Sequence, residues 1–239
     1  KFNFIPNILD REKNNPLFET KLFNKKLENP IGMAAGFDKN AEVYNSLFKL
    51  GFGFVEVGTI TPLKQYGNPK PRVFRLEEDE ALINRLGFNN DGSEIVKKRI
   101  ENNIPSSLLG INIGPNKNTT NMTDDFLRCA EIFFPIGDYI TINISSPNTS
   151  GLRDFHDEDA LKKLLFKINE VREKSNFNKS FLLKVSPDLD SSQIPVIVKL
   201  ILEYKIDGVI LTNTSNKNRE NLIDPNSKEN GGLSGKPIR

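Results

Sequence analysis

The fold of this chain is decided by the stretch Tyr139-Ile-Thr-Ile-Asn-Ile-Ser-Ser-Pro-Asn-Thr-Ser-Gly-Leu-Arg153. It begins as a short apolar run, typical of a buried strand, and continues into a loop of amides and hydroxyls without an acidic residue. Barrel enzymes carry their chemistry on loops of this kind, at the carboxyl ends of the strands. The loop is suited to holding a polar, planar ligand.

The same alternation of an apolar run and a helical segment extends along the chain, which is the pattern of βα units. The predicted strands are residues 31–34, 54–57, 108–113, 139–142, 181–185 and 208–211. The predicted helices are residues 41–50, 93–102, 124–133, 160–174 and 191–204, the last capped by Asp190 or Ser191. Residues 73–76 and 81–83 predict an inserted β-hairpin whose acidic tip faces water. The sequence therefore predicts an α/β fold, a TIM (β/α)8-type barrel that is incomplete, with about six of its eight βα units.

Polar or glycine residues follow every predicted strand, at 34–39, 58–59, 112–114, 143–145, 184–186 and 212–214. One such end alone needs no function, because asparagine and glycine turn the chain well. In a closed parallel barrel, however, all these ends converge on one face. An open doubly wound sheet would concentrate glycines as G-x-G-x-x-G after its first strand, and residues 34–39 lack that pattern.

Composition narrows the class of protein. The 239 residues carry 33 basic and 31 acidic side chains, a net charge of +2 that gives no electrostatic basis for binding nucleic acid. A single cysteine, Cys129, excludes an intramolecular disulfide, and with one histidine no metal site of soft ligands is predicted. We expect Cys129 to pack against the barrel and His156, among acidic neighbours, to be solvated. No apolar run reaches the roughly 18 to 20 residues that cross a bilayer, so the chain as given is expected to be soluble.

The chain resembles the dihydroorotate dehydrogenases of class 2, the quinone-linked type. The motifs that carry this resemblance are spread in order over nearly the whole chain, at residues 34–39, 58–59, 83–90, 110–114, 142–149, 183–184, 212–214 and 231–235. The resemblance implies an enzyme that uses flavin mononucleotide (FMN) to oxidise dihydroorotate to orotate in pyrimidine (UMP) biosynthesis and passes the electrons to a quinone.

The resemblance also implies roles for individual residues. Those expected at the flavin are Ala35, Gly36, Thr59, Asn112, Asn143, Lys184, Thr212 and Gly235. Those expected at the substrate are Lys39, Asn84, Arg85, Leu86, Gly87, Phe88, Asn143, Asn148 and Asn213. Ser146 is expected to be the catalytic base; class 1 enzymes use the more acidic cysteine there, so a serine favours class 2. Lys184 ends an apolar strand, where an unpaired ammonium is costly, and a nearby anion would explain it.

Two departures from the family pattern affect what this chain can do. The motifs stop before the last two βα units, which bind the flavin phosphate, and the upstream membrane-docking region is not found. We therefore interpret residues 1–239 as one flavin-binding barrel domain truncated at both ends, which binds FMN weakly or not at all. The whole enzyme would sit on the membrane periphery, at the cytoplasmic face of the cell membrane in a bacterium or the inner mitochondrial membrane in a eukaryote. Two alternatives stay open, a catalytically incompetent fragment or split-gene remnant, and another flavin barrel such as a tRNA dihydrouridine synthase.

Overall fold

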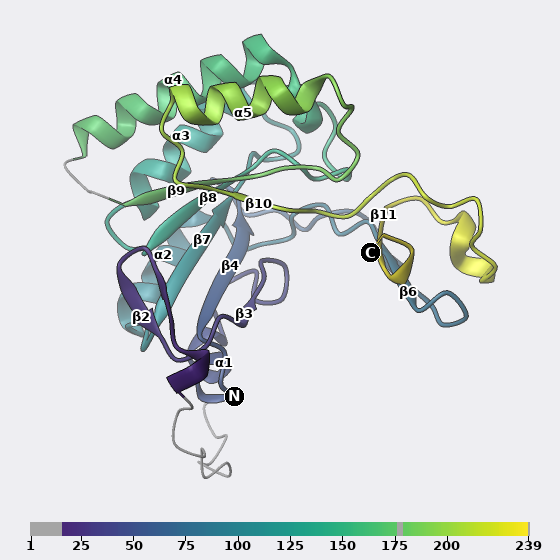
Figure 1. Cartoon of the computed structure of the whole chain (residues 1–239), viewed down its shortest axis with the longest axis horizontal. Helices are drawn as coiled ribbons and strands as arrows, with labels where there is room; N and C mark the ends of the chain where they lie inside the picture. The colour runs from purple at the N-terminus through teal and green to yellow at the C-terminus, as the bar shows by residue number, and fades with distance from the viewer. Residues whose placement is uncertain (1–15, 176–178, 239) are drawn as a thin grey trace.

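The centre of the molecule is a curled, parallel six-stranded sheet, an arc of a barrel (Figure 1). The computed structural model describes residues 16–175 and 179–238. The sheet runs in the order β10-β9-β8-β7-β4-β3, so that strands consecutive along the chain are neighbours except where the hairpin intervenes. Its strands are β3 (Gly32–Met33), β4 (Phe54–Ile60), β7 (Leu108–Ile113), β8 (Tyr139–Asn143), β9 (Ser180–Lys184) and β10 (Gly208–Ile210). All six predicted strands and the barrel-type fold are confirmed.

Five helices cover the convex face of this sheet. They are α1 (Tyr44–Lys49), α2 (Ser93–Asn102), α3 (Met122–Phe133), α4 (Glu158–Lys174) and α5 (Gln193–Glu203). The helix predicted at 124–133 begins two residues earlier, because the side chain of Asn121 accepts hydrogen bonds from the amides of Thr123 and Asp124. The predicted cap of α5 is wrong: Ser192 occupies the N-cap and its side chain forms no capping hydrogen bond.

Alternate residues of the strands point in opposite directions, and this separates a hydrophobic core on the convex side from the lining of the concave side. The outward set, which includes Val55, Ile111, Ile140 and Leu183, packs with the apolar sides of the helices into the main hydrophobic core. Cys129 belongs to this core and is fully buried, as predicted. The inward set lines the concave side of the arc, where the polar residues gather.

An apolar layer closes the amino-terminal end of the concave side. Tyr139, Leu108 and Leu182 point inward there and pack against a small hairpin, β1 (Thr20–Leu22) and β2 (Lys25–Leu27). The ring of Phe23, at the turn of this hairpin, lies 5.2 Å from that of Tyr139 between centroids. Gly110 makes room for the same tyrosine, since a Cβ there would come within 2.0 Å of its ring. The hairpin was not predicted, because each of its strands has a single apolar side chain among polar residues.

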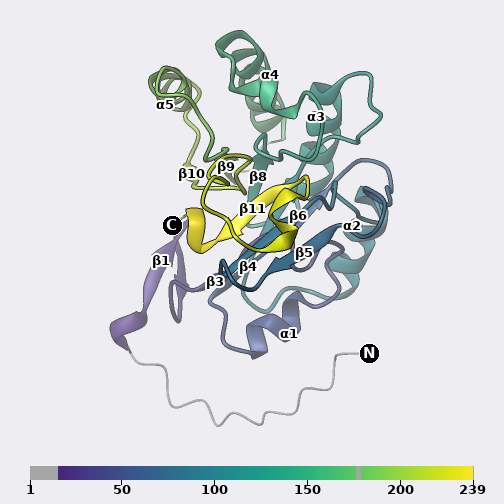
Figure 2. The same cartoon turned by 90° about the vertical axis from the view of Figure 1, so that its right-hand side faces the viewer.

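A separate three-stranded antiparallel sheet projects from the parallel sheet in Figure 1 and faces the viewer in Figure 2. It contains β5 (Val73–Leu76), β6 (Ala81–Asn84) and β11 (Gly232–Gly235), joined by the buried side chains of Leu76, Ile83 and Leu233. The predicted hairpin is confirmed as β5 and β6, whereas β11 was not predicted. At its tip Glu77, Glu78 and Glu80 are exposed.

Four short 3-10 helices complete the described elements: η1 (Pro16–Phe18), η2 (Leu152–His156), η3 (Pro225–Lys228) and η4 (Lys236–Ile238). His156 ends η2 and is 5% exposed, so the prediction of a solvated histidine is wrong. The charged residues around it in sequence face solvent while its own ring turns inward. Within residues 16–175 and 179–238, no helix has both the length and the apolar character needed to cross a membrane.

Candidate active site

A cavity of about 160 Å³ opens at the carboxyl ends of the parallel strands. The carboxyl ends of β4, β6, β8 and β9 supply its walls, together with the loops after β3, β6, β8 and β10. The predicted site residues that line it are Ala35, Gly36, Lys39, Thr59, Asn84, Leu86, Gly87, Phe88, Asn143, Ser146, Asn148, Lys184 and Asn213. The fold therefore brings together side chains that lie up to 178 residues apart, from Ala35 to Asn213.

Neutral amides and hydroxyls make a hydrogen-bonded floor for this cavity. Asn143 donates to the hydroxyl of Thr59 at 2.9 Å and to the side-chain oxygen of Asn112 at 3.1 Å. The Thr59 hydroxyl in turn donates to that same oxygen of Asn112 at 2.6 Å. Asn112 is fully buried and does not line the cavity, so it supports two residues that do.

Ser146 lies at the wall of the cavity and is 4% exposed. Its hydroxyl oxygen accepts a hydrogen bond from the amide N–H of Asn148 at 3.2 Å. Among the residues that the structure describes, no carboxylate or imidazole hydrogen-bonds to this hydroxyl. Any proton that Ser146 accepts must therefore pass to water or to a ligand.

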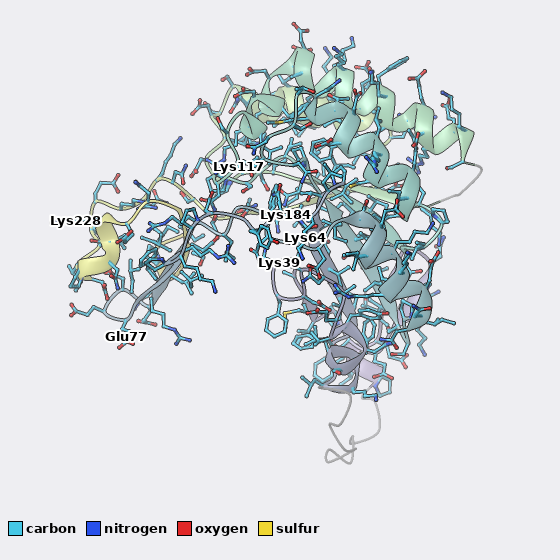
Figure 3. All side chains as sticks on the ribbon, turned by 180° about the vertical axis from the view of Figure 1, so that it is seen from behind. Lys39, Lys64, Glu77, Lys117, Lys184 and Lys228 are labelled. Atoms are coloured by element: carbon cyan, nitrogen blue, oxygen red, sulfur yellow. The ribbon has the colours of Figure 1, made fainter. Side chains whose placement is uncertain are left out.

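Two lysines give the cavity its positive charge, and Figure 3 shows Lys39 and Lys184 close together on the concave side. Burial, and then the neighbouring charges of Arg72 and Lys184, together lower the pKa of Lys39 to about 8. Burial also lowers the pKa of Lys184, but the carboxylate of Glu56 opposes this shift. One buried and one half-buried cation among neutral donors favour an anionic ligand.

A guanidinium that sequence reasoning did not single out ties three of the loops together. Arg153 donates to the backbone oxygen of Ser145 at 3.2 Å, to that of Thr214 at 3.2 Å and to the carboxylate of Asp188 at 2.9 Å. Burial acts to raise the pKa of Asp188, but hydrogen bonds from Asn216, Ser215 and Arg153 outweigh it and the pKa is lowered. In the sequence, the position of Arg153 at the end of the loop 143–153 could have suggested that its side chain contacts this loop.

Glu56 was missed as well, although a lone acid within the apolar run 54–57 was visible in the sequence. It is 4% exposed and its carboxylate accepts from Asn112 at 2.8 Å and from the Thr141 hydroxyl at 2.9 Å. Its negative charge acts to raise the pKa of Lys184, against the larger effect of burial.

Three further predicted residues lie outside the cavity wall. Arg85 turns away, since its guanidinium pairs with Glu229 at 2.6 Å and stacks over the ring of Phe74 at 4.5 Å. Thr212 and Gly235 are exposed, the first after β10 and the second at the end of β11.

Comparison with known proteins agrees with this fold and site. The family model described as dihydroorotate dehydrogenase matches residues 17–239. Proteins named dihydroorotate dehydrogenase (quinone) from Rhodopseudomonas palustris and Christiangramia forsetii are 44% and 48% identical over 228 and 222 residues, or 93% and 92% of this chain. The chain spans 63% and 65% of the lengths of those two relatives.

Solved structures show the same relationship. DHODH from Eimeria tenella in complex with ferulenol superposes with a TM-score of 0.90 at 38% identity, over 95% of this chain and 68% of that one. Its ligand-free form superposes with a TM-score of 0.87 over 95% of this chain and 70% of that one.

The matching family consists of flavin-dependent enzymes. The curled parallel sheet, the cavity at its carboxyl ends and a match over residues 17–239 lead to one assignment. The chain belongs to the dihydroorotate dehydrogenase family.

Proposed function

We propose that the whole protein oxidises (S)-dihydroorotate to orotate with FMN and a quinone as successive electron acceptors, in the synthesis of UMP. The observation that carries this proposal is the placing of Ser146, Lys39 and Lys184 around one buried cavity of amides. The names of the relatives support the same reaction and disfavour both the tRNA-modifying alternative and a non-catalytic remnant. Residues 1–239 would form part of a single flavin-binding barrel domain.

The donors along one side of the cavity fit a flavin. The buried ammonium of Lys184 and the neutral polar groups of Thr59 and Asn143 suit a ring that gains negative charge on reduction. When bound there, FMN would supply the hydride acceptor. We assign Ala35, Gly36, Thr59, Asn143 and Lys184 to the flavin as cavity residues, Asn112 as the support behind them, and Thr212 and Gly235 on the family motif.

The other side of the cavity suits the substrate. Lys39 offers a cation to the carboxylate of dihydroorotate, and Asn84, Asn148 and Asn213 offer amides to the imide edge of its ring. Leu86, Gly87 and Phe88 line the cavity beside them. Arg85 would act by holding the chain before Leu86 in place, because its guanidinium is engaged by Glu229 and its backbone N–H donates to the carbonyl oxygen of Arg72.

Ser146 would remove the proton. Oxidation requires one ring carbon to lose a proton while its neighbour loses a hydride, and a carbon–carbon double bond forms between them. The Ser146 oxygen takes the first proton as its own hydroxyl proton passes to water. Because quinones reside in membranes, we propose that the whole protein is a peripheral membrane protein at the cytoplasmic face of a bacterial cell membrane or at the inner mitochondrial membrane.

Replacement of Ser146 by alanine in the full-length protein tests this assignment. Loss of a general base should lower kcat by at least about 100-fold. The matched control is Ser150→Ala, which removes an exposed hydroxyl from the same loop and should leave turnover near that of the wild type. Undiminished turnover of the Ser146 variant would refute its role as the base.

A further inference from the structure

The side chain of Gln65, in the loop after β4, makes four hydrogen bonds that join two other loops. Its Nε2 donates to the carbonyl oxygens of Gly87 and Phe88, each at 3.1 Å. Its Oε1 accepts from the side-chain nitrogen of Asn116 at 2.9 Å and from the backbone N–H of Lys117 at 3.0 Å. A side-chain amide has two N–H donors and two acceptor sites, so these bonds match its full capacity. A flipped amide would lose all four, and this fixes the orientation of the side chain.

The backbone of the same segment lies directly against the residues that follow β6. Gln65 and Asn90 exchange both of their backbone hydrogen bonds, each at 3.0 Å. Further along, the N–H of Asn68 donates to the carbonyl oxygen of Leu86 at 3.1 Å. A Cβ on Gly67 would come within 2.2 Å of that same oxygen, so the close approach requires a glycine. Residues 65–68 therefore support residues 86–90 along their length.

The backbone that Gln65 holds has an unusual conformation. Phe88 has a φ of +52°, in the left-handed region that a residue with a side chain rarely adopts, and Gly87 before it has a φ of +71°. Such a conformation persists only where surrounding contacts fix it. The two bonds from Nε2 reach the carbonyl groups of these same two residues. Gln65 therefore supplies contacts at the point where the chain needs them.

Gly87 is shared by two cavities. It lines the active-site cavity together with Phe88. It also lines a neighbouring cavity of about 460 Å³, whose other lining residues include Gln65, Asn116 and Lys117. In a trans peptide the C=O and N–H groups point in opposite directions, so the N–H that follows each held carbonyl points away from Gln65. Gln65 therefore determines how the wall between the two cavities presents its backbone groups.

We propose that Gln65 is a positioning residue of the active site, which fixes the backbone of Gly87 and Phe88 and ties it to the loop after β7. It acts from the neighbouring cavity and does not itself contact the ligand. Its effect on the binding of dihydroorotate rests on the proposed function. The positioning of residues 84–92 can be measured without any ligand or turnover.

Hydrogen exchange followed by mass spectrometry measures this positioning in the full-length protein without substrate. Gln65→Glu keeps the length of the side chain and its two acceptor bonds, but it sets an oxygen in place of Nε2 against the carbonyl oxygens of Gly87 and Phe88. Loss of these two hydrogen bonds should raise the exchange rate of residues 84–92 at least about tenfold. Residues 114–120 keep their bonds to Oε1 and should exchange near the wild-type rate. An unchanged rate at residues 84–92 would overturn the proposal.

Two further variants separate these hydrogen bonds from a general loosening of the loop. Gln65→Met removes all four bonds without adding a charge, so it should raise the exchange rate in both segments, and it decides the test if Gln65→Glu does not fold. Tyr66→Ala removes the neighbouring side chain, which is 82% exposed, and should change the rate in neither segment. If Tyr66→Ala raised the rate at residues 84–92 as much as Gln65→Glu does, loosening of the loop would be the cause and the proposal would be wrong.

Ligand affinity tests the consequence for the active site. Residues 84–88 are assigned to the substrate and none of them to the flavin, so Gln65→Glu should raise the Kd for orotate about tenfold and leave the Kd for FMN near the wild-type value. Tyr66→Ala should change neither. An unchanged Kd for orotate, or an equal weakening of both ligands, would overturn the role of Gln65 in the active site. Absence of orotate binding by the wild type would instead refute the proposed function and leave the exchange results intact.

Discussion

The guanidinium of Arg153 and the carboxylate of Asp188 form an ion pair at 2.9 Å that joins the loop after β8 to the loop after β9. The side chains are 24% and 9% exposed, so solvent screens the pair only in part. Because Arg153 also holds Ser145 and Thr214, this contact fixes the loop that presents Ser146.

Replacement of Asp188 by asparagine should lower the free energy of unfolding by about 2 kcal/mol, the scale of a hydrogen bond to a charged group. Urea unfolding measures this change. The exposed pair of Lys199 with Glu158 is the matched control, and Lys199→Gln should cost less than about 1 kcal/mol. If the two variants lost the same free energy of unfolding, the contact of Arg153 with Asp188 would stabilise the protein no more than an exposed ion pair does.

Binding of an anionic ligand should weaken at alkaline pH through Lys39. Burial, then Arg72 and Lys184, lower its pKa to about 8 in the free protein. A carboxylate ligand prefers the protonated lysine, so the Kd for orotate should rise up to about tenfold per pH unit above pH 8. Titration calorimetry of the full-length protein between pH 7 and 10 measures this slope. Lys39→Arg, which stays charged, should flatten it, and an equal slope in this variant would place the titrating group elsewhere.

The contact of Gly110 with Tyr139 predicts a packing defect. A methyl group in Gly110→Ala would lie 2.0 Å from the ring of a tyrosine that is 2% exposed and has no room to move. We expect a loss of about 1–3 kcal/mol in the free energy of unfolding, measured in urea. Tyr139→Leu in the same chain should recover part of it. If the double variant lost as much free energy of unfolding as the two single variants together, the contact between residues 110 and 139 would not be the cause of the defect.

His156 should make the protein less stable in mild acid. Burial, then the charge of Arg153, lower its pKa to about 4, with Asp157 acting in the opposite direction. Between about pH 6.5 and 4 the unfolded chain binds a proton at this residue that the folded chain does not, so stability falls as the pH falls. We expect His156 to account for about 1–2 kcal/mol between pH 7 and 5, which His156→Gln should remove. Urea unfolding of both proteins at pH 7 and pH 5 measures this difference. If both lost the same free energy of unfolding between the two pH values, the prediction would be wrong.

The parallel strands could be predicted because each one is a short, mostly apolar run that ends at polar or glycine residues. Residues 108–113 are fully buried along their whole length, and the predicted bounds match the structure. The hairpin β1–β2 and strand β11 could not be predicted, because each of their strands has a single apolar side chain among polar residues and glycines. Strand β11 exists through its pairing with β6, about 150 residues earlier in the chain.

The cavity residues could be assigned because they follow strand ends, where the fold itself gathers them. Glu56 and Arg153 were missed for a different reason. Each acts through partners distant in sequence, Lys184 and Asp188, and such pairing becomes visible only when the strands are placed side by side. His156 was misjudged because its side chain is buried although Asp154, Asp157 and Glu158 beside it in sequence are exposed.

The hairpin that packs on Tyr139 gives the concave side of the sheet a dry base. This apolar layer gives water no polar path to Ser146 from the amino-terminal end of the strands. Under the proposed function, the proton that Ser146 takes would leave at the opposite end, where the cavity opens. Ligand exchange and proton departure would then share that end of the sheet, and a tightly held product would slow both.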